Sequence, residues 1–404
     1  MEIQRERPLR VLAADDSAVM RGILRELFVL RDEDRLGDLP RMELCGLAQD
    51  GVECLEAVKL LRPDVLVLDL EMPRMNGLEV LDRLRCESPD LPVIMCSSYT
   101  ERGARSTLEA LACGASDYVM KPCEQRDFTA ALLSLSEQLL PRIAALAKAM
   151  RRREDGSGRA SGEQRPREVY VHPQSLVELV VIGLSTGGPS ALEQLLPKLP
   201  ADFPVPVLIV QHMPKVFTAA LAERLNKCCA LHVEQAYDDA PLRAGTVWLA
   251  PGGSHMEVAP RQVMTGEGER GEAVREGIVR LHQQELLNHC RPSVDYLFHS
   301  AARMYGAGTL ALVMTGMGAD GLSGARAVHE RGGVVLAQDA ASSAVWGMPG
   351  RVTEAGIASA TLPLSAIAGA LRRRVNVGRT VRPEPVRDGT AAVASRSEVV
   401  HGLL

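Results

Sequence analysis

VVIGLSTGGP, residues 180–189, is the stretch that decides how this chain folds and acts. A continuous apolar run ends at Ser185, which is flanked by glycines, and a helix-like segment over 190–199 follows. A strand, a tight turn and a helix in this order expose a serine hydroxyl at the end of a strand, and glycine allows the backbone conformations of such a turn. An ordinary strand-to-helix loop and a phosphate-binding loop at a helix N-terminus fit the same stretch. Other parts of the chain therefore have to show whether Ser185 is a nucleophile.

Length and composition indicate a globular protein of two or three domains, because the chain has 404 residues with 46% hydrophobic and 24% charged content. A net charge of -5 and 3% aromatic residues provide neither the basic surface nor the stacking side chains of a nucleic-acid-binding protein. No apolar run is expected to span a bilayer, and residues 1–7 lack a signal-peptide core. We therefore expect a cytoplasmic protein without membrane insertion. The cysteines form no CxxC pair, which favours reduced thiols over a structural zinc site.

Residues 1–135 alternate between strand and helix patterns and predict a doubly wound, five-stranded parallel α/β domain. The predicted strands are 9–14, 42–48, 65–70, 93–96 and 117–120. The predicted helices are 18–30, 52–61, 79–85, 106–112 and a last one from Asp127 toward Met150. Ligands of such sheets bind at the carboxyl ends of the strands, so the residues that follow each strand are the first candidates for a site.

Charged and hydroxyl side chains gather at these strand ends. They are Asp15, Asp16, Asp69, Ser97 and Lys121. Three converging carboxylates suit a hard cation such as Mg²⁺, and a carboxylate beside Mg²⁺ and a lysine can accept a phosphoryl group as a mixed anhydride. Any one of these residues also fits a helix N-cap or a loop charge. All five at strand ends together favour a phosphoryl-transfer site.

Over its whole length this segment resembles a two-component response-regulator receiver domain. The motifs that carry the resemblance are Ala14–Ser17 (ADDS), Leu68–Gly77 (LDLEMPRMNG), Cys96–Ser98 (CSS) and Tyr118–Pro122 (YVMKP). The resemblance implies that Asp69 is the phosphoacceptor. It also implies that Mg²⁺ is held by Asp15, Asp16, Asp69 and the backbone carbonyl of Glu71.

The same resemblance implies a switch pair, Ser97 and Tyr118, and a contact between Lys121 and the phosphoryl group. One departure is the stretch RDEDRLGDLP at 31–40, which makes the loop after the first helix longer than is usual for the family. It lies away from the phosphorylation end, so we expect no effect on function.

A linker is predicted at 136–172, although the last helical pattern of the receiver runs into it as far as Met150. Residues 151–167 are charged, contain glycine and serine, and almost lack apolar side chains, which is typical of a flexible tether. Residues 173–374 again alternate strands and helices and predict a second, mostly parallel α/β domain with a hairpin over 258–280. Residues 375–404 show no periodicity and predict a disordered tail.

Three residues that follow predicted strands of the second domain have the chemistry of a serine hydrolase: Ser185, His212 and Asp320. A serine becomes a nucleophile when a histidine takes its proton, and a carboxylate fixes the histidine tautomer. Oxyanion donors are available from the amide after Ser185 and from the turn around Met317. The chain order Ser, His, Asp differs from the Ser, Asp, His order of the α/β-hydrolases, so that fold is not predicted. His255 follows another strand and is an alternative base, and Asp320 also fits a helix N-cap.

The second domain resembles the catalytic domain of the chemotaxis protein-glutamate methylesterase family, CheB. The motifs are Ile182–Pro189 (IGLSTGGP), Gln211–Pro214 (QHMP), Ala250–Met256 (APGGSHM), Cys290–Asp295 (CRPSVD), Met314–Gly321 (MTGMGADG) and Gln338–Ser342 (QDAAS). The resemblance implies that Ser185 is the nucleophile, His212 the base and Asp320 the orienting carboxylate. It also implies that the Met317 amide is an oxyanion donor and that Thr186 supports the histidine. It implies no cofactor in this domain. Gly253 stands where the family has an aspartate, which affects this loop but not the three catalytic residues.

Together the two resemblances imply a phosphorylation-activated hydrolase. It would remove methyl groups from glutamate γ-methyl esters on methyl-accepting chemoreceptors and deamidate glutamines, with a chemotaxis histidine kinase as phosphodonor. Without phosphorylation the receiver would cover the active site. Two alternatives stay open at this point: an adaptor that binds a signalling partner without catalysis, and a receiver-gated hydrolase in an array that does not serve chemotaxis. Neighbouring genes for a receptor methyltransferase, a histidine kinase and receptors would favour chemotaxis.

Overall fold

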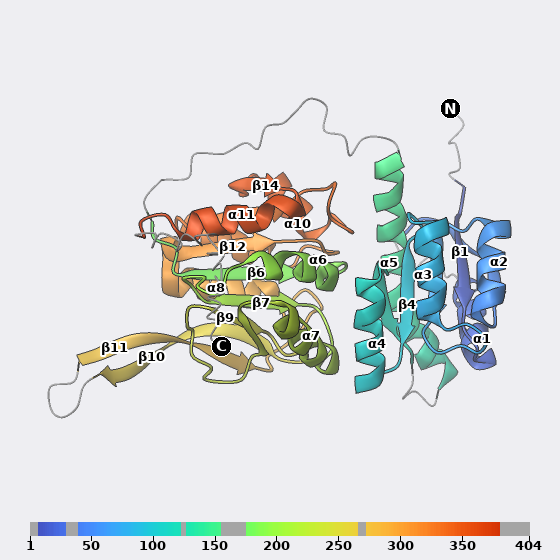
Figure 1. The fold of residues 1–404 in the computed structure, drawn as a ribbon, viewed down its shortest axis with the longest axis horizontal. Helices are drawn as coiled ribbons and strands as arrows, with labels where there is room; N and C mark the ends of the chain where they lie inside the picture. Colours follow the sequence, from blue (N-terminus) through green and yellow to red (C-terminus); the bar gives the residue numbers. More distant parts are fainter. Residues whose placement is uncertain (1–6, 30–38, 123–126, 155–174, 266–271, 380–404) are drawn as a thin grey trace, which may run out of the picture.

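Two α/β bodies lie side by side in the computed structural model, which describes residues 7–29, 39–122, 127–154, 175–265 and 272–379 (Figure 1). Each body is built around its own parallel sheet. Of the predicted insertion, linker and tail, residues 30–38, 155–174 and 380–404 lie outside the described part of the chain.

The N-terminal sheet has five parallel strands in the order β2-β1-β3-β4-β5. The strands are β1 (Leu9–Ala14), β2 (Met42–Ala48), β3 (Val65–Asp69), β4 (Val93–Ser97) and β5 (Asp117–Met120). Every residue of β3 and β4 is buried, because helices cover both faces of the sheet and leave no face for exposed polar side chains. The predicted doubly wound, five-stranded fold is confirmed.

Helices of this body are α1 (Ala18–Val29), α2 (Gly51–Leu61), α3 (Gly77–Glu87), α4 (Glu101–Ala112) and α5 (Phe128–Glu154). Local sequence explains where two of them begin. Asp50 caps α2 by accepting hydrogen bonds from the backbone N–H groups of the first turn. Asn76 and Glu79 form a capping box at the start of α3.

Helix α5 continues to Glu154 and therefore runs through the first part of the predicted linker, at 136–154. Leu139 and Ile143 are fully buried in the core of the N-terminal body. By length and composition, the segment Phe128–Arg152 is the one helix in the described part of the chain that could cross a membrane, which the sequence did not lead us to expect. Packing against the sheet accounts for its apolar side chains.

The C-terminal sheet has seven parallel strands in the order β14-β13-β12-β6-β7-β9-β8. The strands are β6 (Leu179–Leu184), β7 (Val207–Gln211), β8 (His232–Gln235), β9 (Thr246–Leu249), β12 (Thr309–Val313), β13 (Val334–Gln338) and β14 (Ala360–Leu362). The chain builds β7, β8 and β9 on one side of β6 and then β12, β13 and β14 on the other. The predicted parallel α/β domain is confirmed. The boundary between β6 and β12 is a topological switch point, the place where such sheets bind ligands.

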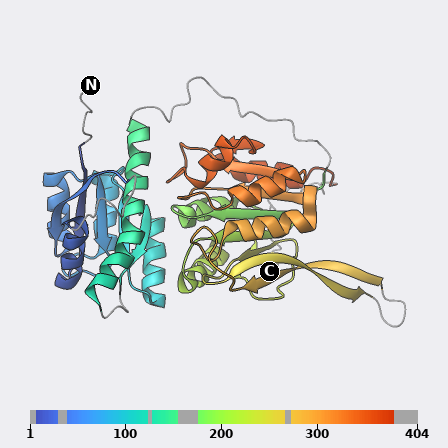
Figure 2. The ribbon, with the colours of Figure 1, turned by 180° about the vertical axis from the view of Figure 1, so that it is seen from behind.

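Helices of the C-terminal body are α6 (Gly188–Leu195), α7 (Lys215–Cys228), α8 (Val294–Tyr305), α9 (Leu322–Glu330), α10 (Met348–Glu354) and α11 (Leu364–Val375), with short 3₁₀ turns at Leu196–Lys198 and Gly306–Gly308. The predicted hairpin is present as the antiparallel pair β10 (His255–Thr265) and β11 (Glu272–His282). It projects away from the N-terminal body (Figure 2). The sequence did not predict β8, α10, β14 and α11: β8 and β14 are short strands, α10 has only seven residues, and α11 has no side-chain N-cap.

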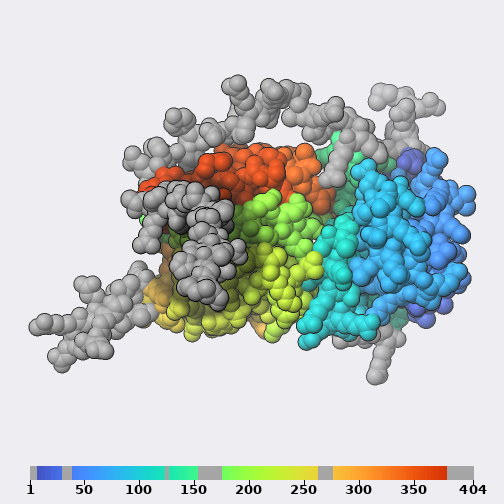
Figure 3. Space-filling view, viewed as in Figure 1, coloured from blue at the N-terminus to red at the C-terminus, as the bar shows by residue number. Residues whose placement is uncertain are grey.

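The N-terminal body faces the carboxyl edge of the C-terminal sheet. Helix α4 packs against α6 and α7 of the other body. In the space-filling view the cyan surface of α4 touches the yellow-green surface beside it (Figure 3). The two bodies are therefore in direct contact, and the N-terminal body covers the carboxyl edge of the C-terminal sheet.

Candidate active site

Three loops meet at the carboxyl edge of the C-terminal sheet, next to the switch point. Ser185 follows β6 and His212 follows β7, and these strands pair with Leu184 opposite Gln211. Asp320 lies in the loop between β12 and α9, and β12 pairs with the other side of β6. Adjacent strands are about 4.8 Å apart, so the three predicted catalytic residues leave the sheet side by side.

Hydrogen bonds fix the loop that carries Ser185. Its backbone N–H donates to the carbonyl of Thr315 at 3.0 Å, and Thr315 Oγ1 donates to the carbonyl of Thr186 at 2.9 Å. Gly187 has a φ of 75°, a left-handed conformation that favours glycine. The glycine of this motif is therefore needed to turn the chain from β6 into α6 immediately after the serine.

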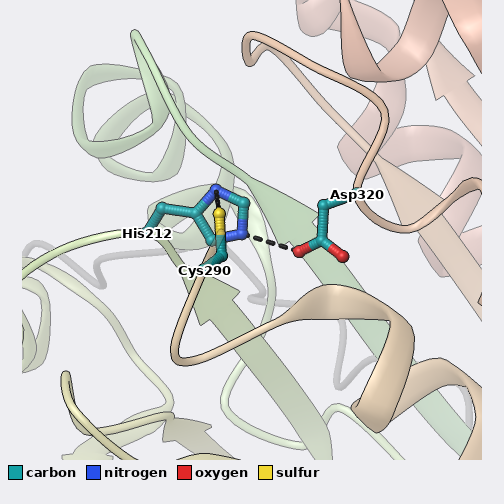
Figure 4. A group of neighbouring side chains, drawn as sticks. All are labelled: His212, Cys290 and Asp320. Carbon is teal, nitrogen blue, oxygen red and sulfur yellow. Dashed lines mark hydrogen bonds and ion pairs between the residues drawn. The ribbon is translucent and has the colours of Figure 1, made fainter. Parts of the chain in front are cut away.

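A buried hydrogen bond joins His212 to Asp320 (Figure 4). His212 Nε2 lies 2.8 Å from Asp320 Oδ2, and Asp320 is only 3% exposed. The other donors to this carboxylate are Ser293 Oγ (2.7 Å), Val294 N (2.7 Å), Asn288 Nδ2 (2.8 Å) and Asp295 N (3.3 Å). Burial raises the pKa of Asp320, but the hydrogen bonds from His212 and Ser293 outweigh burial and lower it to about 2. Asp320 is an anion in a fixed position, and Gly321, not Asp320, is the N-cap of α9.

The second ring nitrogen of His212 faces Cys290, with the sulfur 3.7 Å from Nδ1 (Figure 4). Burial lowers the pKa of His212, but the hydrogen bonds to Asp320 and Cys290 outweigh burial and raise it to about 10. The raised pKa favours the charged form of the imidazole, which has no free lone pair to accept a proton. Within the described residues, the half-buried Ser185 hydroxyl makes no hydrogen bond to His212. Base and serine are neighbours, but they are not engaged.

Two backbone N–H groups beside Ser185 have no partner in the part of the chain that the structure describes: those of Thr186 and Met317. The neighbouring Gly316 is held in place, since its N–H donates to the carbonyl of Val345 at 3.0 Å. Free donors on a fixed turn are what an oxyanion hole requires. The Thr186 hydroxyl makes no hydrogen bond to His212 among the described residues; it donates to Asp117 of the N-terminal body at 2.7 Å.

His255, the alternative base, is fully buried and has both ring nitrogens occupied. Its Nε2 lies 3.0 Å from the carbonyl of Glu285, and its Nδ1 accepts from the backbone N–H of Ser293 at 3.2 Å. Burial lowers the pKa of His255. A neutral imidazole with both nitrogens bonded to backbone has a structural role, so the structure does not favour His255 as the base.

A second site lies at the carboxyl edge of the N-terminal sheet, around Asp69. Lys121 Nζ lies 2.7 Å from Asp69 Oδ2 and 2.9 Å from Asp15 Oδ2. Burial and the nearby Asp15 raise the pKa of Asp69 to about 6. A cavity of 660 Å³ opens over the site and is lined by Asp16, Asp69, Glu71 and Lys121 among others.

The donors around Asp69 fit a hard divalent cation. One carboxylate oxygen from each of Asp15, Asp16 and Asp69 lies within 4.8 Å of the others. Within the described residues, the one polar partner of the buried Oδ2 atoms of Asp15 and Asp69 is the Lys121 amine. An oxygen-only set of this kind is suited to Mg²⁺. The side chain of Glu71 points elsewhere, to Arg102 at 3.7 Å, which leaves its backbone carbonyl as the predicted ligand.

Comparison with known proteins identifies the family of each body. The response regulator receiver domain family matches residues 11–133, and the CheB methylesterase family matches residues 180–371. A protein-glutamate methylesterase/protein-glutamine glutaminase of Trichodesmium erythraeum is 41% identical over 368 residues, which cover 91% of this chain and 99% of the relative. The chain belongs to this family.

Other relatives give the same result. The methylesterase/glutaminase of a Nocardioides strain is 42% identical over 380 residues, covering 91% of this chain and 95% of the relative. Among solved structures, the catalytic domain of Thermotoga maritima CheB methylesterase is 38% identical, covering 49% of this chain and 99% of that one, with a TM-score of 0.45.

In this member of the CheB family the receiver covers the catalytic edge through the end of its sheet. Tyr118 of β5 stacks on Phe217 of α7, with ring centroids 4.7 Å apart and planes 7° from parallel. The preceding residue, Asp117, accepts the hydrogen bond from Thr186. Ser190 Oγ donates to the carbonyl of Leu111 at 2.9 Å. The contact reaches the predicted oxyanion turn as well, since Met317 and Val345 pack against the receiver core that includes α5.

The predicted switch residues lie on neighbouring strands, Ser97 at the end of β4 and Tyr118 in β5. Ser97 is fully buried and accepts a hydrogen bond from Thr107 Oγ1 at 2.7 Å. Tyr118 points outward into the contact with Phe217. No hydrogen bond joins Ser97 to Tyr118 among the described residues. Tyr118 therefore occupies the contact between the two bodies rather than the space above Ser97.

Sequence reasoning missed five residues of these sites: Asn288, Cys290 and Ser293 around the histidine and aspartate, and Asp117 and Phe217 at the contact between the bodies. The first three flank or lie in the CRPSVD motif, which carried the resemblance but received no role. Asp117 follows no strand, and Phe217 lies inside a helix, so the rule that selects strand ends passes over both.

Proposed function

We propose that this chain is a phosphorylation-controlled methylesterase and glutaminase that acts on methyl-accepting chemoreceptors in the cytoplasm. The observation that carries the proposal is the meeting of Ser185, His212 and Asp320 at one edge of a sheet, with His212 2.8 Å from a buried Asp320, in a member of the CheB family. The receiver and catalytic domains that we propose correspond to the bodies from β1 to α5 and from β6 to α11.

In the proposed reaction, Ser185 Oγ attacks the carbonyl carbon of a glutamate methyl ester and its proton passes to His212. Because Nε2 is engaged with Asp320, Nδ1 is the nitrogen that takes this proton. The N–H groups of Thr186 and Met317 stabilise the oxyanion that forms. His212 returns the proton to the methoxy group, and methanol leaves a glutamyl-serine ester. Water then attacks this ester, so that glutamate and free Ser185 result. A glutamine side chain follows the same steps and releases ammonia.

The receiver supplies the control. A chemotaxis histidine kinase would transfer a phosphoryl group to the Asp69 carboxylate, beside Lys121. Mg²⁺ bound by Asp15, Asp16, Asp69 and the Glu71 carbonyl would offset the negative charge gathered there. In the arrangement described here, β5 and α4 cover the catalytic edge and His212 is not engaged with Ser185. Phosphorylation would weaken this contact through Ser97 and Tyr118, because the added charge reorders the neighbouring residues.

Release of methanol from methylated receptor membranes tests the proposal. The wild-type chain should release methanol, a phosphodonor should increase the rate, and Ser185→Ala should release none. Ser323→Ala is a matched control for loss of a hydroxyl, because Ser323 lies on the exposed side of α9 with its Oγ 3.0 Å from His299 Nε2. If the wild-type chain binds receptor membranes but releases no methanol, it is an adaptor. If it hydrolyses only other esters, it is a hydrolase of a different signalling array.

A further inference from the structure

A tight turn, Leu287–Cys290, lies against the His212–Asp320 pair. Leu287 and Cys290 exchange two backbone hydrogen bonds, at 3.2 and 2.9 Å. Asn288 and His289 between them have φ values of 53° and 60°. Two successive residues in the left-handed region define a two-residue hairpin turn, and asparagine tolerates this region better than most residues. The backbone therefore fixes the directions in which Asn288 and Cys290 point.

Asn288 bridges two buried carboxylates. Its Nδ2 donates to Asp320 Oδ1 at 2.8 Å and to Asp295 Oδ2 at 2.9 Å, and both aspartates are at least nine-tenths buried. Burial and the neighbouring Asp320 raise the pKa of Asp295. A neutral donor between the two acids keeps Asp320 in place without adding charge. Without it, Asp320 Oδ1 would keep Ser293 and a longer contact to the Asp295 amide.

Cys290 contacts His212, the other member of the His212–Asp320 pair. Its sulfur lies 3.7 Å from His212 Nδ1, while His212 Nε2 meets Asp320 (Figure 4). The imidazole is thus held at both nitrogens, by Asp320 and by Cys290. The sulfur therefore lies beside the nitrogen that, in the proposed reaction, takes the proton of Ser185.

We propose that the turn Leu287–Cys290 is a positioning clamp for the catalytic pair, in which Asn288 holds the Asp320 carboxylate and Cys290 holds the His212 ring. The clamp rests on the proposed function, since it serves the proton transfer assigned to His212. Within the described residues, Asn288 and Cys290 make hydrogen bonds to Asp320, Asp295 and His212 and none to Ser185, so they are assigned as positioning residues rather than catalytic residues.

The test uses the full chain activated by a phosphodonor and measures methanol release as kcat, KM and the pH dependence of kcat/KM. Asn288→Ala should lower kcat by about 10- to 100-fold, which is the effect of losing a hydrogen bond to a charged group, and leave KM nearly unchanged. Cys290→Ala should move the acid limb of the pH profile to lower pH, because the contact with Cys290 raises the pKa of His212. Cys290→Ser keeps a polar atom at the same carbon and should retain part of the shift.

Matched controls separate positioning from general damage. His289→Gly lies in the same exposed turn and keeps its left-handed backbone, so it should behave like the wild-type chain. The titratable groups that contact His212 are Asp320 and Cys290, with Asp295 behind Asn288. Asp295→Asn shows whether the second acid contributes to the pH profile.

Two results would overturn the clamp: a wild-type kcat in Asn288→Ala, or a pH profile of Cys290→Ala that matches the His289→Gly control. Both presuppose methanol release by the wild-type chain that depends on Ser185. If that release is absent, the proposed function fails instead. Thermal unfolding midpoints equal to the wild-type value exclude misfolding as the cause of a lower kcat, and Cys290→Ser covers the case in which Cys290→Ala does not fold.

Discussion

The hydrogen bond between the two bodies offers the sharpest perturbation of the proposed control. Thr186 Oγ1 donates to Asp117 Oδ2 at 2.7 Å, and the two residues are 4% and 6% exposed. The bond ties the turn after the proposed nucleophile to the strand that carries Tyr118. Asp117→Asn keeps the shape of the side chain and removes its charge. We expect it to weaken the closed arrangement and raise the methylesterase activity of the unphosphorylated chain.

The size of the effect follows from the type of bond. A hydrogen bond to a charged group contributes about 1.5–3 kcal/mol and a neutral one about 0.5–1.5 kcal/mol. The substitution should therefore cost the closed arrangement about 1–1.5 kcal/mol, which corresponds to about a 5- to 10-fold shift toward the open arrangement. Basal activity should rise by the same factor, up to the rate of the phosphodonor-treated wild-type chain. Arg142 also contacts Asp117, at 3.1 Å, but it lies within the receiver. Weakening that contact therefore affects the closed and the open arrangement alike.

Initial rates of methanol release without a phosphodonor measure this effect. Glu223→Gln is the matched control, since Glu223 pairs with Arg105 across the same contact at 3.5 Å but both side chains are more than half exposed. Exposed ion pairs contribute little, so this variant should stay within about twofold of the wild-type rate. An unchanged basal rate in Asp117→Asn, in a chain that a phosphodonor still stimulates, would refute the role assigned to this contact.

Four further predictions concern the receiver and the base. Asp69→Asn should abolish stimulation by a phosphodonor and keep basal activity, and persistent stimulation would contradict the gating. The same change should stabilise the receiver at pH 8 without Mg²⁺ by up to about 3 kcal/mol. The reason is that the pKa of Asp69 is raised from 3.8 to about 6, so the stability of the wild-type receiver falls as pH rises through this range. Urea unfolding of both proteins at pH 4 and pH 8 measures the difference, and an Asp69→Asn variant that is no more stable than the wild type at pH 8 would contradict it. Chelation of Mg²⁺ should remove stimulation without altering the basal rate, and stimulation that survives chelation would argue against the ligand set. Basal kcat/KM, corrected for the Ser185→Ala rate, should reach half its maximum above pH 7, because the pKa of His212 is raised and only the neutral ring accepts a proton. A midpoint near pH 6.5 would show that the contacts of His212 do not raise its pKa in solution.

Much of the fold follows from local patterns. Buried parallel strands give continuous apolar runs, so β3, β6 and β7 could be located within one or two residues. Polar residues after those runs point to the sheet edge because parallel strands all end there. This is why Ser185, His212, Asp320 and Asp69 can be selected as candidate site residues without a structure. Short strands such as β8 and β14 were not predicted, because three or four residues are too few to show a periodic pattern.

By itself, the sequence determined which residues reach the two sheet edges, because strand periodicity and the glycines of the turns act over a few neighbouring positions. Only the tertiary structure decided what those residues contact. Thr186 and Asp117 are 69 positions apart, and Cys290 and His212 are 78 apart. Contacts over such separations depend on how helices and whole domains pack, which no local pattern records. Tertiary packing therefore makes Asp117 of the receiver the partner of the Thr186 hydroxyl and places Cys290 beside the His212 ring. It also lets the receiver cover the sheet edge that carries Ser185.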